Sequence, residues 1–355
     1  MTSDVTYAEP QPQHRPRWRI VLGIVLSLGA LALAYLNRAW LLEAFGLVRA
    51  ANPLWMIAAL AIIAGSYFVS SQVFQVVLRS LGHRVSPLRL WGIALVAIVT
   101  SQSFPAGGVG SYAFLLSAFR RHRVPPGQAA LVAALEAFSY AGAMLIFATF
   151  GLGYIASRAL ALDESGFPVR GPLLAALLAL LAIGTAVTLV TRPAATLTRA
   201  LLALNRLLSR VLRRPIGDGW AHSAVDEIIH GRALIADRKL LLALLVLIQM
   251  AALSGHSLAL LVILHSLGAA ASVEVVFAAF GIALLTSTFN VLPGGGGTVE
   301  TVLVVTLTQL GAGAAAVPAA ILFRLLNFWI MLPPAGLAYA WLSRGTSDRS
   351  AARTK

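Results

Sequence analysis

The chain has 355 residues, of which 59% are apolar and only 11% are charged, and its formal net charge is +14. A soluble protein of this length needs a more charged surface around its core, so the composition excludes that class. Apolar runs of roughly 20 residues recur along the chain, as transmembrane helices require. We therefore expect an all-α polytopic membrane protein.

The charge and the cysteine count restrict the ligands. Loops rich in Lys and Arg set the topology of membrane proteins and contact anionic lipid head groups, which accounts for the basic balance. Basic patches interleaved with aromatic residues are absent, so we expect no nucleic-acid partner. The chain has no cysteine, which excludes disulfides and thiolate metal sites, and no cofactor is expected.

The chain begins with a polar segment, residues 1–17, which we expect to be a disordered cytoplasmic tail. An apolar run of about 19 residues follows at 18–36. A cleaved signal peptide is the alternative, because residues 32–34 read Ala-Leu-Ala. The run is longer than a signal core, so an uncleaved first span is the interpretation we adopt.

Seven further spans complete an expected single transmembrane domain at 18–342. Their expected positions are about 54–78, 88–104, 127–150, 173–190, 240–264, 275–292 and 317–341. The basic segment 192–239 reads as a cytoplasmic loop that begins with an amphipathic interfacial helix. Residues 343–355 form a second expected cytoplasmic tail.

Two spans end at glycine-rich breaks, FPAGGVG and PGGGG. Each glycine disfavours a helix by about 1 kcal/mol relative to Ala, so such runs end one. Helices restarting at Ser111 and Thr298, with these residues as N-caps, would present free backbone N–H groups to an anion. The alternative is that glycine simply permits close helix packing. The substrate-binding candidates in the two breaks are Gly107, Gly108, Gly110, Ser111, Gly294, Gly295, Gly297 and Thr298.

Three charged residues of the predicted spans and their breaks are candidates for a binding site, namely Glu136, Glu300 and Arg324. A charge in a span faces the bundle interior or a pathway, because exposure to lipid is costly. One interpretation is a static ion pair between Arg324 and either Glu300 or Glu136. The other is that Arg324 binds a phosphate in bidentate fashion while the carboxylates neutralise, gate or carry protons. We assign all three to substrate binding and none to catalysis, so an enzyme is not expected.

Histidines offer weaker candidates. His256 lies in the sixth predicted span, where a lone histidine is most often a packing residue. His222, Asp226 and His230 share one helical face with a metal-like spacing, but three ligands on one helix are a weak signal. No metal site is assigned.

The chain contains an internal repeat. LRSLG at 78–82 matches LHSLG at 264–268, which lies 186 residues later. GGVGS at 107–111 matches GGGGT at 294–298, and Glu136 falls opposite Arg324, at nearly the same offset. The ordered series indicates duplication, with repeat one at about 18–150 and repeat two at about 172–342.

The distribution of Lys and Arg predicts that the repeats are inverted. One set of loops carries 22 of the 27 basic residues and the other set carries four, which places both termini in the cytoplasm. LRSLG then lies inside and LHSLG outside. The limb 111–119 is too short to cross a core of about 30 Å, so each glycine break reads as the tip of a re-entrant broken helix. Opposed broken helices in inverted repeats are typical of alternating-access transporters.

The second break and the last span carry the pattern P-G-G-x-G-x-x-E followed by an Arg. This resembles the lysylphosphatidylglycerol synthase transmembrane-region family, which includes the flippase module of the multiple peptide resistance factor. The resemblance covers about residues 18–342 and implies lipid translocation. It departs from the family at Gly296, where a bulky apolar residue is expected. The chain also ends 13 residues after Leu342, without the aminoacyl transferase domain of fused members, so lysyl transfer is not carried over. The matching positions are Pro293, Gly294, Gly295, Gly297, Glu300 and Arg324.

These observations favour a flippase-like translocase of an anionic phospholipid or polyprenyl-phosphate-linked lipid in a bacterial cytoplasmic membrane. The alternative is a non-transporting accessory protein that scaffolds an enzyme of lipid or envelope glycan synthesis. An intramembrane lipid-modifying enzyme is a third interpretation. It requires catalytic His or Asp residues clustered near one membrane interface, and the sequence offers only scattered candidates. The expected partners are anionic membrane lipids and, in the alternative, a lipid-synthesis enzyme.

Overall fold

The computed structural model describes residues 51–103, 107–161, 239–287 and 298–344, together with isolated helical positions elsewhere. All elements in these ranges are helical, which confirms the all-α, multi-pass class. Four helices are long and apolar enough to cross a membrane. The predicted spans at 18–36 and 173–190, both terminal tails and most of the loop 192–239 lie outside the described residues. These four candidate spans, selected by length and composition alone, are Pro53–Ser80, Pro126–Arg158, Leu240–Ser266 and Val299–Ser343.

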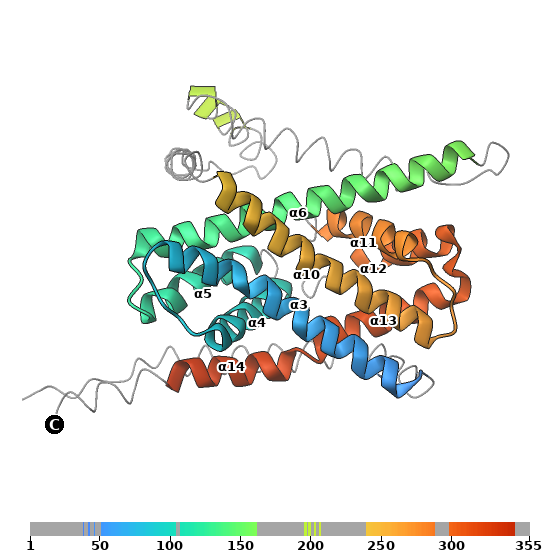
Figure 1. Cartoon of the computed structure of the whole chain (residues 1–355), viewed down its shortest axis with the longest axis horizontal. Coiled ribbons are helices and arrows are strands. Elements are labelled where there is room, and N and C mark those ends of the chain that lie inside the picture. Colours follow the sequence, from blue (N-terminus) through green and yellow to red (C-terminus); the bar gives the residue numbers. More distant parts are fainter. Residues whose placement is uncertain are drawn as a thin grey trace, which may run out of the picture. The chain divides into compact units, whose positions relative to one another are not determined.

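Two helices of 28 residues, α3 (Pro53–Ser80) and α10 (Lys239–Ser266), pack against each other along their lengths. The Ser70 hydroxyl donates to Gln249 Oε1 at 3.0 Å, and the rings of Tyr67 and His256 meet edge to face at 4.9 Å. Tyr67 precedes Ser70 on α3, whereas its partner His256 follows Gln249 on α10. The two helices therefore run antiparallel, as Figure 1 also shows.

Glycine allows two helix pairs to approach closely. A Cβ atom added at Gly255 of α10 would collide with the Ser66 hydroxyl of α3. One added at Gly281 would collide with the Phe147 carbonyl oxygen, where α11 (Val273–Ser287) packs on α6 (Pro126–Ala161). Lipid tails are as apolar as the helices, so close packing of this kind is a main source of helix association in membranes.

Two shorter pairs of helices form hairpins. In the first, α4 (Pro87–Ser103) packs on α5 (Gly107–Arg121), and in the second, α11 packs on α12 (Thr298–Leu307). The longest of these four, α4, has 17 residues and extends about 25 Å, which is less than the thickness of a membrane core of about 30 Å. The segments 88–104 and 275–292 were predicted as spans, but α4 and α11 are not among the four candidate spans. The flank of α4 is covered by α14 (Leu332–Arg344).

The prediction that the first hairpin restarts as a helix at Ser111 is wrong, because α5 already begins at Gly107. The three glycines lie in its first turn, where each costs only about 1 kcal/mol of helix propensity and packing against α4 offsets that cost. Ser111 is therefore inside the helix and is not an N-cap. The predicted restart at Thr298 is confirmed, since α12 begins there.

The last predicted span, 317–341, is interrupted in the structure. After α12 the chain passes through the π-helical turn η2 (Thr308–Ala312), which is kinked at Gly311 with a φ of 100°, and the 3₁₀ turn η3 (Gly313–Ala315). It continues as α13 (Ala316–Arg324), a second π-helical turn η4 (Leu325–Trp329) and α14. π-helical turns are rare and often mark functional sites. The second one begins directly after Arg324.

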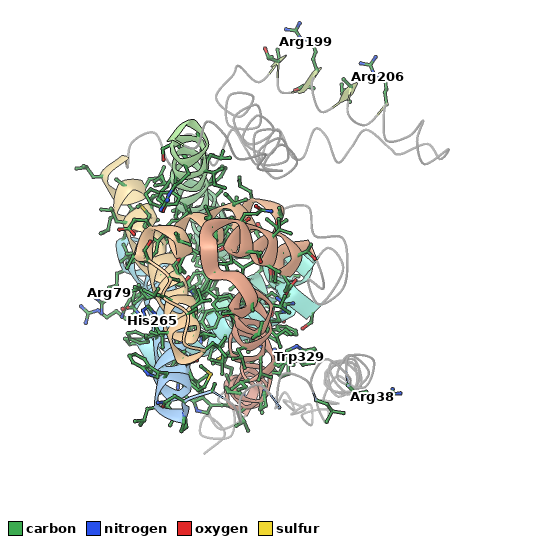
Figure 2. All side chains as sticks on the ribbon, turned by 90° about the vertical axis from the view of Figure 1, so that its right-hand side faces the viewer. Arg38, Arg79, Arg199, Arg206, His265 and Trp329 are labelled. Carbon is green, nitrogen blue, oxygen red and sulfur yellow. The ribbon has the colours of Figure 1, made fainter. Side chains whose placement is uncertain are left out.

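The two turns that the repeat aligns have the same backbone structure. Gly82 and Gly268 have φ angles of 82° and 76°, in the left-handed region that glycine tolerates best. In the first turn the His83 amide donates to Leu78 O at 2.8 Å, and in the second the Ala269 amide donates to Leu264 O at 3.0 Å. Arg79 and His265, which Figure 2 labels, occupy equivalent places in these two turns.

We expect Gly281→Ala to destabilise the protein, since its new methyl group must displace backbone of α6. Overpacking of this kind lowers the free energy of unfolding by about 1–3 kcal/mol. The matched control is Gly65→Ala on α3, where an added Cβ meets nothing within 4 Å. Melting temperatures of the purified variants in detergent test this, and equal melting of both variants would contradict the close packing of α6 and α11.

Candidate functional site

A cavity of about 680 Å³ lies among the long helices and the two hairpins. Its walls combine apolar side chains with polar groups contributed by both halves of the chain, as ligand sites do. Gln102 and Ser111 come from the first hairpin, and Glu300 comes from the second. Other polar residues of the lining are Tyr67, Ser70, Ser101, Tyr112, Glu136, Tyr140, Gln249, His256, Arg324 and Asn327.

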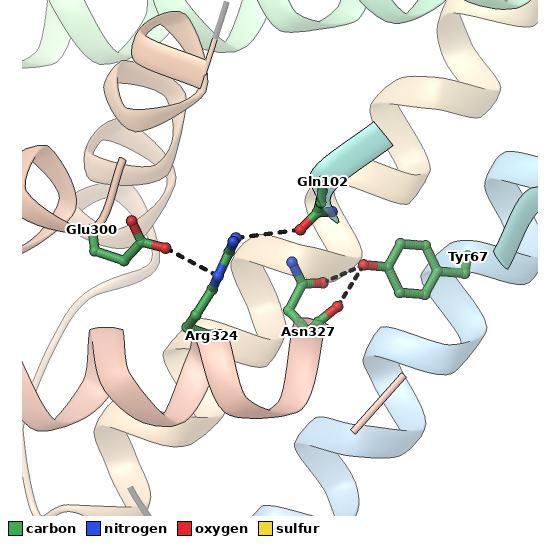
Figure 3. A network of polar contacts seen from close by, with 5 residues as sticks. All are labelled: Tyr67, Gln102, Glu300, Arg324 and Asn327. Carbon is green, nitrogen blue, oxygen red and sulfur yellow. Dashed lines mark hydrogen bonds and ion pairs between the residues drawn. The ribbon is translucent and has the colours of Figure 1, made fainter. Parts of the chain in front are cut away.

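Arg324 is the cation of this cavity and ends α13. Its Nε lies 3.2 Å from Glu300 Oε1, and its Nη1 donates to Gln102 Oε1 at 3.2 Å (Figure 3). The guanidinium carbon also lies 4.7 Å from the centre of the Phe328 ring, within the range of a cation–π interaction. The side chains of Arg324 and Glu300 are only 14% and 21% exposed.

One nitrogen of Arg324 has no hydrogen-bond partner among the described residues. Its Nη2 is buried and makes no hydrogen bond within the part of the chain that the structure describes. A buried donor without an acceptor is costly, and more so when it carries charge. The guanidinium therefore has an unused donor in a residue that lines the cavity.

The structure chooses between the two ion pairs that the sequence left open, because Arg324 pairs with Glu300 and not with Glu136. Glu136 lies on α6 and lines the same cavity. Within the described residues, its carboxylate forms no hydrogen bond or ion pair. Among the described residues, the cavity thus contains one paired carboxylate, Glu300, and one unpaired carboxylate, Glu136.

The glycine-rich breaks are only partly described. Ser111 lines the cavity from the second turn of α5, so its predicted place in the site is compatible with the geometry although its predicted capping role is not. Thr298 is the first residue of α12, two residues before Glu300. Gly294, Gly295 and Gly297 lie outside the described residues.

Several cavity residues were missed by the sequence reasoning. The Tyr67 hydroxyl lies 2.7 Å from Asn327 Oδ1 and 2.8 Å from Asn327 O, which ties α3 to η4 (Figure 3). Asn327 lies three residues after Arg324, and that spacing on one helical face was the signal that could have found it. Gln102 had no such signal, because only the folded hairpin brings it to Arg324.

His256 was expected to be a packing residue, and its geometry is compatible with that view. It is 8% exposed, its Nδ1 lies 2.9 Å from Ala252 O, and it packs on Tyr67. It also lines the cavity. The weak metal candidates His222, Asp226 and His230 lie outside the described residues, among which there is no cluster of three metal-ligating side chains.

The long apolar helices and the polar cavity between them define a multi-pass helical membrane protein. A family model described as the lysylphosphatidylglycerol synthase transmembrane region matches residues 20–335. The chain belongs to this family, and the resemblance inferred from the sequence is confirmed. A comparison with curated proteins finds no match.

Removing one partner of the Arg324–Glu300 pair should lower the stability of the protein more than removing both. Glu300→Gln leaves the guanidinium buried with less compensation, so we expect destabilisation of about 1–3 kcal/mol. The double variant Glu300→Gln/Arg324→Gln removes that uncompensated charge and should melt closer to the wild type than Glu300→Gln alone. Thermal unfolding of the three variants and the wild type in one detergent measures the coupling. Strictly additive losses would mean that the two side chains do not interact.

Proposed function

We propose that this protein translocates an anionic lipid, such as a phospholipid, a modified phospholipid or a polyprenyl-phosphate-linked lipid, across the bacterial cytoplasmic membrane. It has no catalytic role in this proposal, and both termini lie in the cytoplasm. The observation that carries the proposal is the unused Nη2 donor of Arg324 in a residue that lines a cavity of about 680 Å³. A phosphate oxygen is an acceptor that satisfies such a donor, and arginine binds phosphate through two parallel hydrogen bonds.

Each charged group has a role in this proposal. Arg324 holds the lipid phosphate, assisted by the positive end of α12 at Thr298. Glu300 neutralises the guanidinium when the cavity is empty and releases one of its nitrogens when phosphate binds. Glu136, whose carboxylate has no partner among the described residues, gates the cavity or carries a proton. The lipid tails remain in the surrounding membrane.

We further propose that the two halves are inverted repeats and that each hairpin re-enters the membrane from one face. The antiparallel packing of α3 and α10 supports this, as does their equal length at an offset of 186 residues. Helix contacts also occur in matching pairs, since α4 packs on α14 as α11 packs on α6. A site between opposed broken helices is how transporters of this kind expose a substrate to alternate sides.

The inverted arrangement predicts opposite accessibility of equivalent residues. Ser86 and Ser272 are both exposed and each accepts a hydrogen bond from a backbone amide three residues later, at 3.4 Å. The chain has no cysteine, so Ser86→Cys and Ser272→Cys each introduce a single thiol. In intact cells, a membrane-impermeant maleimide should label Ser272→Cys and leave Ser86→Cys unlabelled until the membrane is opened. Labelling of both thiols from the same side would rule out inversion.

The translocation itself is tested in proteoliposomes. Fluorescent phospholipids and polyprenyl-phosphate analogues in the inner leaflet become accessible to an external quencher only if they cross. We expect the wild type to move at least one lipid class and Arg324→Gln to move it at least about tenfold more slowly, since charge-assisted hydrogen bonds are lost. Glu136→Gln should alter the dependence of the rate on a pH gradient.

Arg158→Gln is the matched control, because it also removes one arginine. Arg158 stacks on Tyr154 near the end of α6, is exposed and does not line the cavity. It should transport lipid at the wild-type rate. If the wild type moves no lipid in the panel, with or without a pH gradient, the accessory or scaffold function becomes the better account.

A further inference from the structure

A second cavity, of about 590 Å³, lies at the turn that joins α3 to α4. It shares no lining residue with the central cavity. Three of its side chains are basic or imidazole groups, and none is acidic. The lining residues are Gln75, Arg79, Gly82, His83, Arg84, Val85 and Pro87.

Gln75 supplies a buried donor without an acceptor. The residue is 8% exposed, and its Nε2 makes no hydrogen bond within the described part of the chain. The amide NH₂ group is a donor only, so an acceptor atom is needed to satisfy it, and Gln75 is one of the residues that line the cavity. Leaving such a donor unsatisfied costs free energy, whereas a leucine of similar size at this position does not.

The cations around this cavity have no acidic partner among the described residues. Arg79 and Arg84 are exposed, and Figure 2 shows Arg79 projecting outward from the helices. His83 is held by Gln128, whose Oε1 lies 2.6 Å from the imidazole Nε2. The cavity wall also includes Pro87, the first residue of the 17-residue helix α4, where the helix dipole is positive. The two arginines and the start of α4 therefore favour an anion.

The turn after α10 shows that the basic residues and Gln75 are not needed to form the backbone structure of the turn after α3. The turn after α10 has the same hydrogen bonds and the same left-handed glycine. It has His265, Ala269 and Ala270 where the first turn has Arg79, His83 and Arg84, and Leu261 stands opposite Gln75. Topology alone accounts for basic residues in a cytoplasmic loop, but it does not account for a buried amide donor beside them.

We infer that this cavity binds a phosphate group, carried either by a lipid head group or by a soluble phosphate compound. Arg79 and Arg84 supply charge and paired donors, Gln75 supplies the buried neutral donor, and His83 is positioned by Gln128. Arginine and backbone N–H groups are the usual ligands of phosphate in proteins. This site lies apart from Arg324, so its occupancy does not depend on the proposed transport.

Binding is measured on the purified full-length protein by isothermal titration calorimetry, with dioctanoyl phosphatidic acid as the lipid probe and inorganic phosphate as the soluble one. The wild type and Arg324→Gln are titrated in parallel, because the second background lacks the cation of the central cavity. We expect Arg324→Gln to retain one binding event. If both probes bind, the site recognises the phosphate group in either kind of compound. If only phosphatidic acid binds, the site is specific for a lipid phosphate.

Two variants locate that event. Arg79→His/Arg84→Ala copies the second turn and should weaken binding at least about tenfold without unfolding the protein. Gln75→Leu should weaken binding while the melting temperature stays equal or rises, which a purely structural role of Gln75 would not produce. The charge-matched control Arg120→Gln/Arg121→Gln removes two exposed or partly exposed arginines that do not line this cavity, and it should bind as the parent does.

Either of two results overturns the inference. One is the absence of any binding event in the Arg324→Gln background while the variant remains folded. The other is an equal loss of affinity in Arg120→Gln/Arg121→Gln, with Gln75→Leu binding as tightly as its parent, because the attraction would then be a diffuse effect of basic charge. Neither result bears on lipid translocation, which is measured separately.

Discussion

A guanidinium group inside an apolar protein must be neutralised and hydrogen-bonded, and the arrangement around Arg324 follows from that requirement. Its charge is balanced by Glu300 of α12, and a second nitrogen is satisfied by Gln102 of α4. One side chain therefore links the ends of both hairpins to α13. The hairpins converge on this point although 222 residues of chain separate Arg324 from Gln102.

The long helices provide the frame that makes this convergence possible. The antiparallel pair α3 and α10 packs closely at Gly255, and α6 packs closely on α11 at Gly281. The second contact holds α11, and with it the second hairpin, against α6. The central cavity lies among the long helices and the two hairpins.

The polar groups of the cavity are unevenly satisfied. Tyr67 and Asn327 are hydrogen-bonded to each other, whereas the Nη2 of Arg324 has no partner among the described residues, and neither does the carboxylate of Glu136. Fully paired groups hold the helices in place. An unpaired buried group costs free energy, and a ligand that supplies the missing partner removes that cost. The same distinction applies at the second cavity, where His83 is held by Gln128 and the amide nitrogen of Gln75 has no partner there. Both cavities thus have, in their walls, a hydrogen-bonded side chain and a side chain with a buried donor that lacks a partner among the described residues.

The membrane class and the helical class were determined by the sequence itself, which also predicts an internal repeat. Apolar runs of span length admit few structures besides transmembrane helices, since lipid leaves no other way to satisfy the backbone. Arg324 and Glu300, which the structure pairs in the central cavity, could also be selected as candidates from the sequence, because charges are rare in such runs. Which carboxylate pairs with Arg324 was decided only by tertiary structure, because Glu136 and Glu300 are equally plausible until the helices are packed. Gln102 and Asn327 likewise became site residues only through packing, and α5 began at Gly107 because contact with α4 outweighs the weak helix propensity of glycine.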